Sequence, residues 1–161
     1  LMEQSFWYDH CKNKYLDYKN WNPIFYKLSP NLEVANCIAY AGKDPSNYHM
    51  QYLTELDQII ENLFKDKNYD VAFVDAGIYI RGDIVNKLFN KVDIIIAHDT
   101  NSFGMYLYHK IKPPAHYKKI VYSQGCGTTF WINENRMYLI RAIQKEFGLP
   151  IEPFSLDKAE N

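Results

Sequence analysis

The sequence lacks any apolar segment approaching the roughly 20 residues that a membrane-spanning helix needs, and no signal-peptide pattern is visible in it. It also lacks an excess of charge of either sign, because 18 basic residues balance 19 acidic ones and leave a net charge of −1. No basic stripe or nucleic-acid-binding motif accompanies this balance. We therefore expect neither a membrane nor a nucleic acid as a partner.

Cysteine is scarce, with three residues at positions 11, 37 and 126. An odd number at wide spacing, without a Cys-x-x-Cys pair, excludes a disulfide framework and does not match the ligand spacing of a zinc site. This usage is typical of a reduced intracellular chain, so we expect a cytoplasmic location. The sequence gives no indication of the oligomeric state.

What the chain does contain is enough apolar material for one core. It has 161 residues, of which 47% are hydrophobic and 23% are charged, and these proportions are ordinary for a globular domain. No internal repeat or linker divides it. We predict a single domain over residues 1–148, followed by a tail over residues 149–161.

Two short apolar runs with a helical pattern between them are the clearest local signal. Residues 71–74 and 94–97 are continuous apolar stretches, and residues 82–90 between them repeat with a helical period. Continuous apolar runs are typical of strands buried on both faces, and a helix joining two of them indicates a βαβ unit with parallel strands.

The remaining elements follow from periodicity and from turn residues. Strands over 119–122 and 128–132 flank a glycine-containing turn, which is the pattern of a β-hairpin. We predict an α/β fold: a Rossmann-like, mostly parallel sheet with helices on both faces and a C-terminal antiparallel β-hairpin. The other predicted elements are helices over 5–18, 50–65, 103–111 and 136–147, and a buried strand over 37–41.

Polar residues follow the predicted strands at the points where the strands end. Asp75 comes directly after one strand, and His98 and Asp99 come directly after the next. The carboxyl ends of parallel strands meet at one edge of a sheet, where ligands bind, so we expect these residues to lie together. The turn around Cys126 follows a strand of the same expected direction and is predicted to join them. Because His98 and Asp99 abut an apolar strand, we expect both to be at least half buried.

These strands resemble part of a known family. The run Tyr69-Asp70-Val71-Ala72-Phe73-Val74-Asp75, a helix, and then Asp93-Ile94-Ile95-Ile96-Ala97-His98-Asp99 resembles strands four and five of the class I S-adenosylmethionine-dependent methyltransferases. The hairpin over 117–133 is similar to their antiparallel sixth and seventh strands. Leu1-Met2-Glu3, with the helix that follows, resembles the end of their second strand.

The resemblance implies a cofactor and a class of reaction. It implies S-adenosyl-L-methionine as the cofactor, with Glu3 gripping its ribose hydroxyls and Asp75 as a second cofactor-binding residue. It implies methyl transfer to a small polar molecule or a sugar. The family's first strand ends in a glycine-rich turn, and none of the seven glycines clusters ahead of the first helix. The resemblance therefore implies that this strand lies upstream of Leu1, or that the domain lacks it.

Candidate residues for the chemistry follow. His98 is the predicted general base for a hydroxyl acceptor, because its ordinary pKa lies near neutrality. Asp99 is the second catalytic candidate, with a helix cap as the alternative role.

Tyr79, Arg81 and Asn101 are the candidate substrate-binding residues. Arg81 is one of only three arginines, and a guanidinium can clamp a carboxylate or phosphate. The alternative for Arg81 is a salt bridge to Asp83 or Asp44.

Two further alternatives stay open. Asp75, Asp99 and Asn101 supply oxygen ligands of the kind that Mg²⁺ prefers, but their spacing does not favour a metal site, and we predict none. A non-catalytic, Rossmann-like binding or structural module is the competing hypothesis to an enzyme. A nucleotide-sugar-handling enzyme is a third, because carboxylate-rich edges suit sugars in general.

Overall fold

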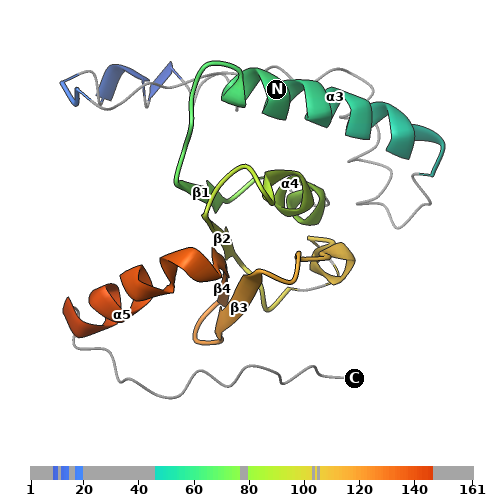
Figure 1. The fold of residues 1–161 in the computed structure, drawn as a ribbon. Helices are drawn as coiled ribbons and strands as arrows, with labels where there is room; N and C mark the ends of the chain where they lie inside the picture. The colour runs from blue at the N-terminus through green and yellow to red at the C-terminus, as the bar shows by residue number, and fades with distance from the viewer. Residues whose placement is uncertain are drawn as a thin grey trace.

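The protein has an α/β architecture built around a four-stranded sheet (Figure 1). The structure, a computed structural model, describes residues 9–10, 12–14, 17–19, 46–76, 80–102, 104 and 106–146. The elements with bounds along this part of the chain are α3 (Ser46–Phe64), β1 (Val71–Val74), α4 (Arg81–Leu88), β2 (Ile94–His98), the 3₁₀ turn η1 (Tyr108–Lys110), β3 (Tyr117–Tyr122), β4 (Thr128–Asn133), the 3₁₀ turn η2 (Glu134–Arg136) and α5 (Met137–Glu146).

The strand order is β1-β2-β4-β3. β1 and β2 are parallel, which confirms the βαβ unit, and their register pairs Val74 with Ala97. β4 lies antiparallel to both β2 and β3, which confirms the C-terminal hairpin. The prediction of a mostly parallel sheet is wrong for the described strands, because only one of their three pairings is parallel. The short hairpin connection forces β4 to run antiparallel to β3. β4 also pairs with β2, and this pairing is antiparallel too.

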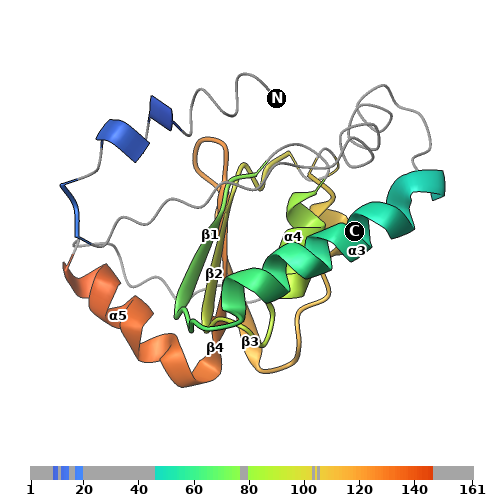
Figure 2. The same ribbon diagram turned by 90° about the horizontal axis from the view of Figure 1, so that it is seen from above.

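Helices cover both faces of the sheet, as predicted. Figure 2 shows α3 and α4 on one side of the strands and α5 on the other. On the first side, Leu56 and Ile60 of α3 and Val85 of α4 pack against Ile95 and Trp131 of the sheet. Leu56 and Ile60 lie four positions apart, so they share one face of their helix. On the second side, α5 packs against Ile94, Ile120 and Ile132.

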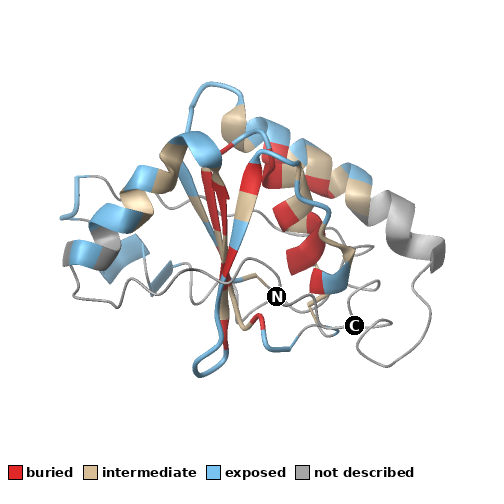
Figure 3. Ribbon diagram, turned by 60° about the horizontal axis from the view of Figure 1, so that its bottom comes forward, coloured by how far each residue is buried: buried red, intermediate tan, exposed pale blue. Residues whose placement is uncertain are grey.

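The two parallel strands differ in burial, and Figure 3 shows the buried residues concentrated on the strands and on α4. β2 is buried along both faces, with Ile94 and Ile95 at 7% and 0% exposure. β1 is buried on one face only: Val74 is 4% exposed, but Val71 and Phe73 are 48% and 62% exposed. The expectation that both strands are buried on both faces is therefore wrong for β1. The cluster under α5 is built from β2, β3 and β4, and it does not include β1.

One predicted helix does not form. Of residues 103–111, only Tyr108–Lys110 are helical among those described, as the short turn η1. Leu107 has a φ of 57°, a left-handed conformation that an α-helix does not include. The backbone here serves α4 instead, because the carbonyl of Tyr106 accepts a hydrogen bond from the N–H of Gly82 at 3.0 Å.

Several predictions lie outside the described residues or only partly within them. The strand over 37–41, the tail over 149–161 and the opening residues Leu1–Glu3 are not described, and the helix over 5–18 is described only in part. Among the residues that are described, no helix is both long and apolar enough to cross a membrane.

Candidate functional site

The candidate site lies where β1 and β2 end. The parallel register pairs the last residue of β1 with Ala97, so the next residues, Asp75 and His98, are neighbours. Asp99 follows at once. The carboxyl edge of this parallel pair therefore brings two carboxylates and an imidazole together, as the sequence predicts.

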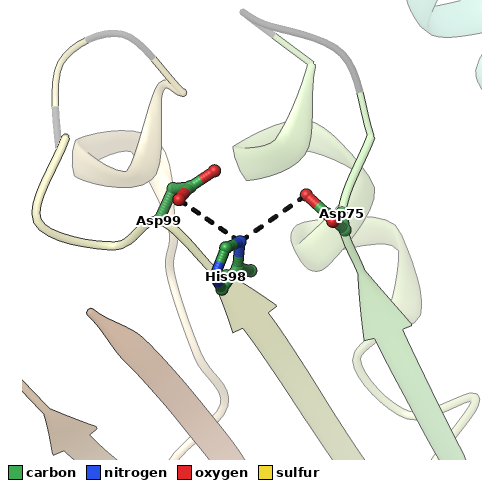
Figure 4. A group of neighbouring side chains, drawn as sticks. All are labelled: Asp75, His98 and Asp99. Atoms are coloured by element: carbon green, nitrogen blue, oxygen red, sulfur yellow. Dashed lines mark ion pairs between the residues drawn. The ribbon is translucent and has the colours of Figure 1, made fainter. Parts of the chain in front are cut away.

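His98 lies between the two carboxylates (Figure 4). Its Nδ1 atom is 3.2 Å from Oδ1 of Asp99 and 3.8 Å from Oδ1 of Asp75. The His98 side chain is 41% exposed and that of Asp99 is 21% exposed, which confirms that both are more than half buried. A carboxylate can only accept, so the neutral imidazole that fits this contact carries its proton on Nδ1 and a lone pair on Nε2.

Arg81, at the start of α4, joins the two strand ends. Its Nη2 atom pairs with Asp75 Oδ1 at 2.8 Å, and its Nη1 atom pairs with Asp99 Oδ2 at 3.0 Å. The guanidinium also donates to the carbonyl of Ala76 at 2.6 Å and to that of His98 at 3.0 Å. With its side chain 7% exposed, Arg81 is a buried cation whose hydrogen-bond and ion-pair partners come from the ends of both parallel strands. Among the described residues its ion pairs are with Asp75 and Asp99, at the strand ends, whereas Asp44, one of the two alternative partners, lies outside those residues.

Asp99 bridges the cation and the imidazole. Its Oδ1 atom contacts His98, and its Oδ2 atom accepts from Arg81. Burial alone would raise the pKa of Asp99, but the hydrogen bond from Arg81, followed by electrostatic effects of His98 and Arg81 and by a contact with Cys126, lowers it below its ordinary value of 3.8. Its φ of 57° is left-handed, a conformation in which aspartate is more frequent than most residues. This strained backbone turns the carboxylate toward the other site residues.

Two tyrosines outside the predicted set complete the site. The Tyr106 ring lies 4.0 Å from the Arg81 guanidinium, and its hydroxyl donates to Asp99 at 3.4 Å. The Tyr108 hydroxyl donates to the carbonyl of His98 at 2.6 Å. Burial raises the pKa of Tyr108, so it remains a neutral donor. Nothing in the sequence separated these two from the other tyrosines, of which the chain has 14 in total.

Asn101 connects the site to the hairpin. Its side-chain amide donates to the carbonyls of Ser123 and Gly125 at 3.1 and 2.9 Å. Its backbone N–H donates to the carbonyl of Cys126 at 3.1 Å. The turn around Cys126 thus lies against the loop after β2, at the edge where the sequence predicted it.

The structure therefore places five of the seven predicted site residues. It brings Asp75, Arg81, His98 and Asp99 into one cluster and directs the amide of Asn101 toward the hairpin turn. Glu3 and Tyr79 lie outside the described residues.

The charge of the cluster limits what it can bind. Two carboxylates and one guanidinium give a net charge of −1 when His98 is neutral, so the cluster suits a cationic group better than an anionic one. One ligand atom each from Asp75, His98 and Asp99 lie within 4.8 Å of one another, a separation that a metal ion could bridge. A cation there would have to share both carboxylates with Arg81.

Comparisons with known proteins give no relative for this chain. A scan against protein-family models finds no match, and searches of curated proteins and of solved structures find none either.

Proposed function

We propose that the chain is a methyltransferase-like enzyme that methylates a hydroxyl group of a small polar molecule or sugar, with His98 as the general base. The observation that carries this proposal is the 3.2 Å contact between His98 Nδ1 and Asp99 Oδ1. This contact orients the imidazole so that Nδ1 carries the proton and Nε2 presents its lone pair. An imidazole oriented in this way by a carboxylate is a common arrangement for proton abstraction.

The fold supports the proposal at a coarser level. The parallel βαβ unit followed by an antiparallel hairpin matches the elements that the resemblance assigns to strands four to seven. In addition, the site lies at the carboxyl edge of the parallel pair, where open α/β sheets bind ligands.

Each described residue has a distinct part in this proposal. Nε2 of His98 would accept the hydroxyl proton, and Asp99 would stabilise the imidazolium that results. The cofactor would supply the methyl group, whose bond to sulfur breaks as the bond to the acceptor oxygen forms, and would leave as the neutral thioether. Arg81 is a positioning residue, because its donors are directed at protein atoms and hold Asp75 and Asp99 in place.

The charge of the described cluster supports the implied cofactor. S-adenosylmethionine, when bound, supplies a methyl group already activated as a sulfonium. Its sulfonium and ammonium groups are cationic, and the described cluster carries an excess negative charge. Asp75, with its side chain 48% exposed, is the carboxylate most open to such a group.

The experiment measures cofactor binding and methyl transfer separately. Calorimetry with S-adenosylmethionine and the full chain should show binding, weakened in Asp75→Asn. Transfer from methyl-labelled cofactor to a panel of sugars and small alcohols should fall by about 10²–10⁴-fold in His98→Asn, with cofactor binding retained. A folded chain that binds no cofactor at millimolar concentration overturns the proposal and favours a non-catalytic binding module.

A second candidate function rests on the close approach of Asp75, His98 and Asp99. Two carboxylates and an imidazole suit a divalent cation such as Zn²⁺ or Mn²⁺, which lowers the pKa of a bound hydroxyl. The third metal ligand in this candidate site is His98, whereas the site considered from the sequence used Asn101. Calorimetric titration with Zn²⁺, Mn²⁺ and Mg²⁺ tests this function, and binding should be lost in Asp75→Asn and His98→Asn. The absence of heat for all three ions excludes it.

A further inference from the structure

A cavity of about 140 Å³ lies on the sheet face that α3 and α4 share, separate from the cluster at the strand ends. Its walls include Trp131 and Thr129 of β4, Lys119 of β3, and Tyr108 and Thr100 from the segment after β2. An apolar cavity of about 150 Å³ is large enough for benzene, so this space suits a single six-membered ring with a small substituent.

The polar groups of the cavity favour an anionic substituent. The side-chain ammonium of Lys119 makes no hydrogen bond or ion pair with any residue that the structure describes, although that of its strand neighbour Lys118 pairs with Glu134 at 3.5 Å. Lys119 pairs with Trp131 in the β3–β4 register, so the ammonium and the indole line the same side of the sheet. Residues 107–122, which supply most of the cavity's rim, hold four lysines and two histidines and no acidic residue.

Thr100 supplies an independent observation. The residue is 9% exposed, and its hydroxyl has no hydrogen-bond partner among the described residues. A buried hydroxyl without a partner is costly, and such groups are rare in folded proteins. A ligand atom that accepts from this hydroxyl would remove the cost.

We infer that this cavity binds a small planar carboxylate, with its ring against Trp131 and its carboxylate between Lys119 and the hydroxyl of Thr100. The inference does not depend on methyl transfer, because none of Asp75, Arg81, His98 and Asp99 lines the cavity. It assigns the chain a second small-molecule site, lined in part by Tyr108. Tyr108 is the structural link between them, since its hydroxyl bonds to the carbonyl of His98.

The test uses benzoate as the probe and benzamide as its neutral match. Titration followed by amide and indole NMR signals should show saturable shifts at the Trp131 indole with benzoate, and about fivefold weaker binding of benzamide. Lys119→Gln should weaken benzoate binding by about fivefold, whereas Lys118→Gln, on the opposite face of the same strand, should leave it unchanged.

Thr100 variants test the second contact. Thr100→Val should weaken benzoate binding by about 3–10-fold without lowering the melting temperature of the free protein, and Thr100→Ser should retain binding. No saturable shift at about 20 mM benzoate overturns the inference. Equal affinity for benzoate and benzamide, or equal effects of Lys119→Gln and Lys118→Gln, also overturns it. None of these outcomes bears on cofactor binding at the strand ends.

Discussion

Arg81 and Asp99 are joined by a 3.0 Å contact between Nη1 and Oδ2, and the carboxylate turns its other oxygen toward His98. Arg81 therefore positions the imidazole of His98 indirectly, through the carboxylate of Asp99. This dependence gives the site properties that substitution can measure.

Replacing Arg81 should destabilise the protein. In Arg81→Met, two carboxylates lose their cation and the carbonyls of Ala76 and His98 lose a donor. Removing one partner of a buried ion pair costs about 3–5 kcal/mol, and the partial exposure of the aspartates reduces this to about 2–3 kcal/mol. Urea unfolding measures the change. Arg141→Met, at an exposed position of α5, is the control and should stay within about 0.5 kcal/mol.

Asp99 should make stability depend on pH in the acid range. Its pKa in the folded protein is below the ordinary value of 3.8, so the unfolded chain binds a proton first as the pH falls. The stabilisation is complete above the ordinary value and is lost as the pH falls through the lower folded pKa. Urea unfolding between pH 6 and pH 3 should show a steeper decline for the unmodified protein than for Asp99→Asn. Equal slopes would contradict this assignment.

Gly82 should not tolerate a side chain. A Cβ atom there would lie 2.2 Å from the carbonyl oxygen of Leu107, because α4 begins directly against that segment. Gly82→Ala should cost about 1–3 kcal/mol in unfolding free energy. Gly104→Ala is the matched control, since nothing lies within 4 Å of a Cβ atom at that position. A Gly82→Ala protein as stable as Gly104→Ala would show that the segment can move away.

The two glycines of the hairpin turn should differ in their response to alanine. Both have positive φ, at 63° for Gly125 and 79° for Gly127, so both variants carry backbone strain of about 1 kcal/mol. Only at Gly127 would the new Cβ atom meet Asn101, at 2.9 Å from its backbone nitrogen. Thermal unfolding should therefore rank Gly127→Ala below Gly125→Ala. The same order should appear in the NMR shifts of the Asn101 amide.

Local sequence patterns predicted most of the described elements and the position of the site. β1 and β2 follow from apolar runs, and α3 follows from a helical stripe that includes Leu56 and Ile60. Asp75, His98 and Asp99 could be placed together because parallel strands carry the residues that follow them to one edge.

Other features depend on contacts between distant residues, which local patterns do not encode. The apolar spacing of residues 103–111 resembles a helix, but hydrogen bonding of Tyr106 to Gly82 and the left-handed Leu107 replace it. For the same reason Tyr106 and Tyr108 were not selected. Their roles arise from contacts with Arg81 and with the carbonyl of His98. Two of the three strand pairings are antiparallel because β4 lies between β2 and β3. Which strands become neighbours depends on contacts between distant residues.

The insertion of β4 between β2 and β3 has a consequence for how the site is assembled during synthesis. All four residues of the cluster have been synthesised once Asp99 is added to the chain, yet β2 gains its second neighbour only when residues up to Asn133 have emerged from the ribosome. The loop that carries Thr100 and Asn101 bonds to the turn at Cys126 and Gly127, so it too must wait for the hairpin. A chain stopped shortly after the cluster would contain every proposed catalytic group and still lack the strand and the turn that hold those groups in register.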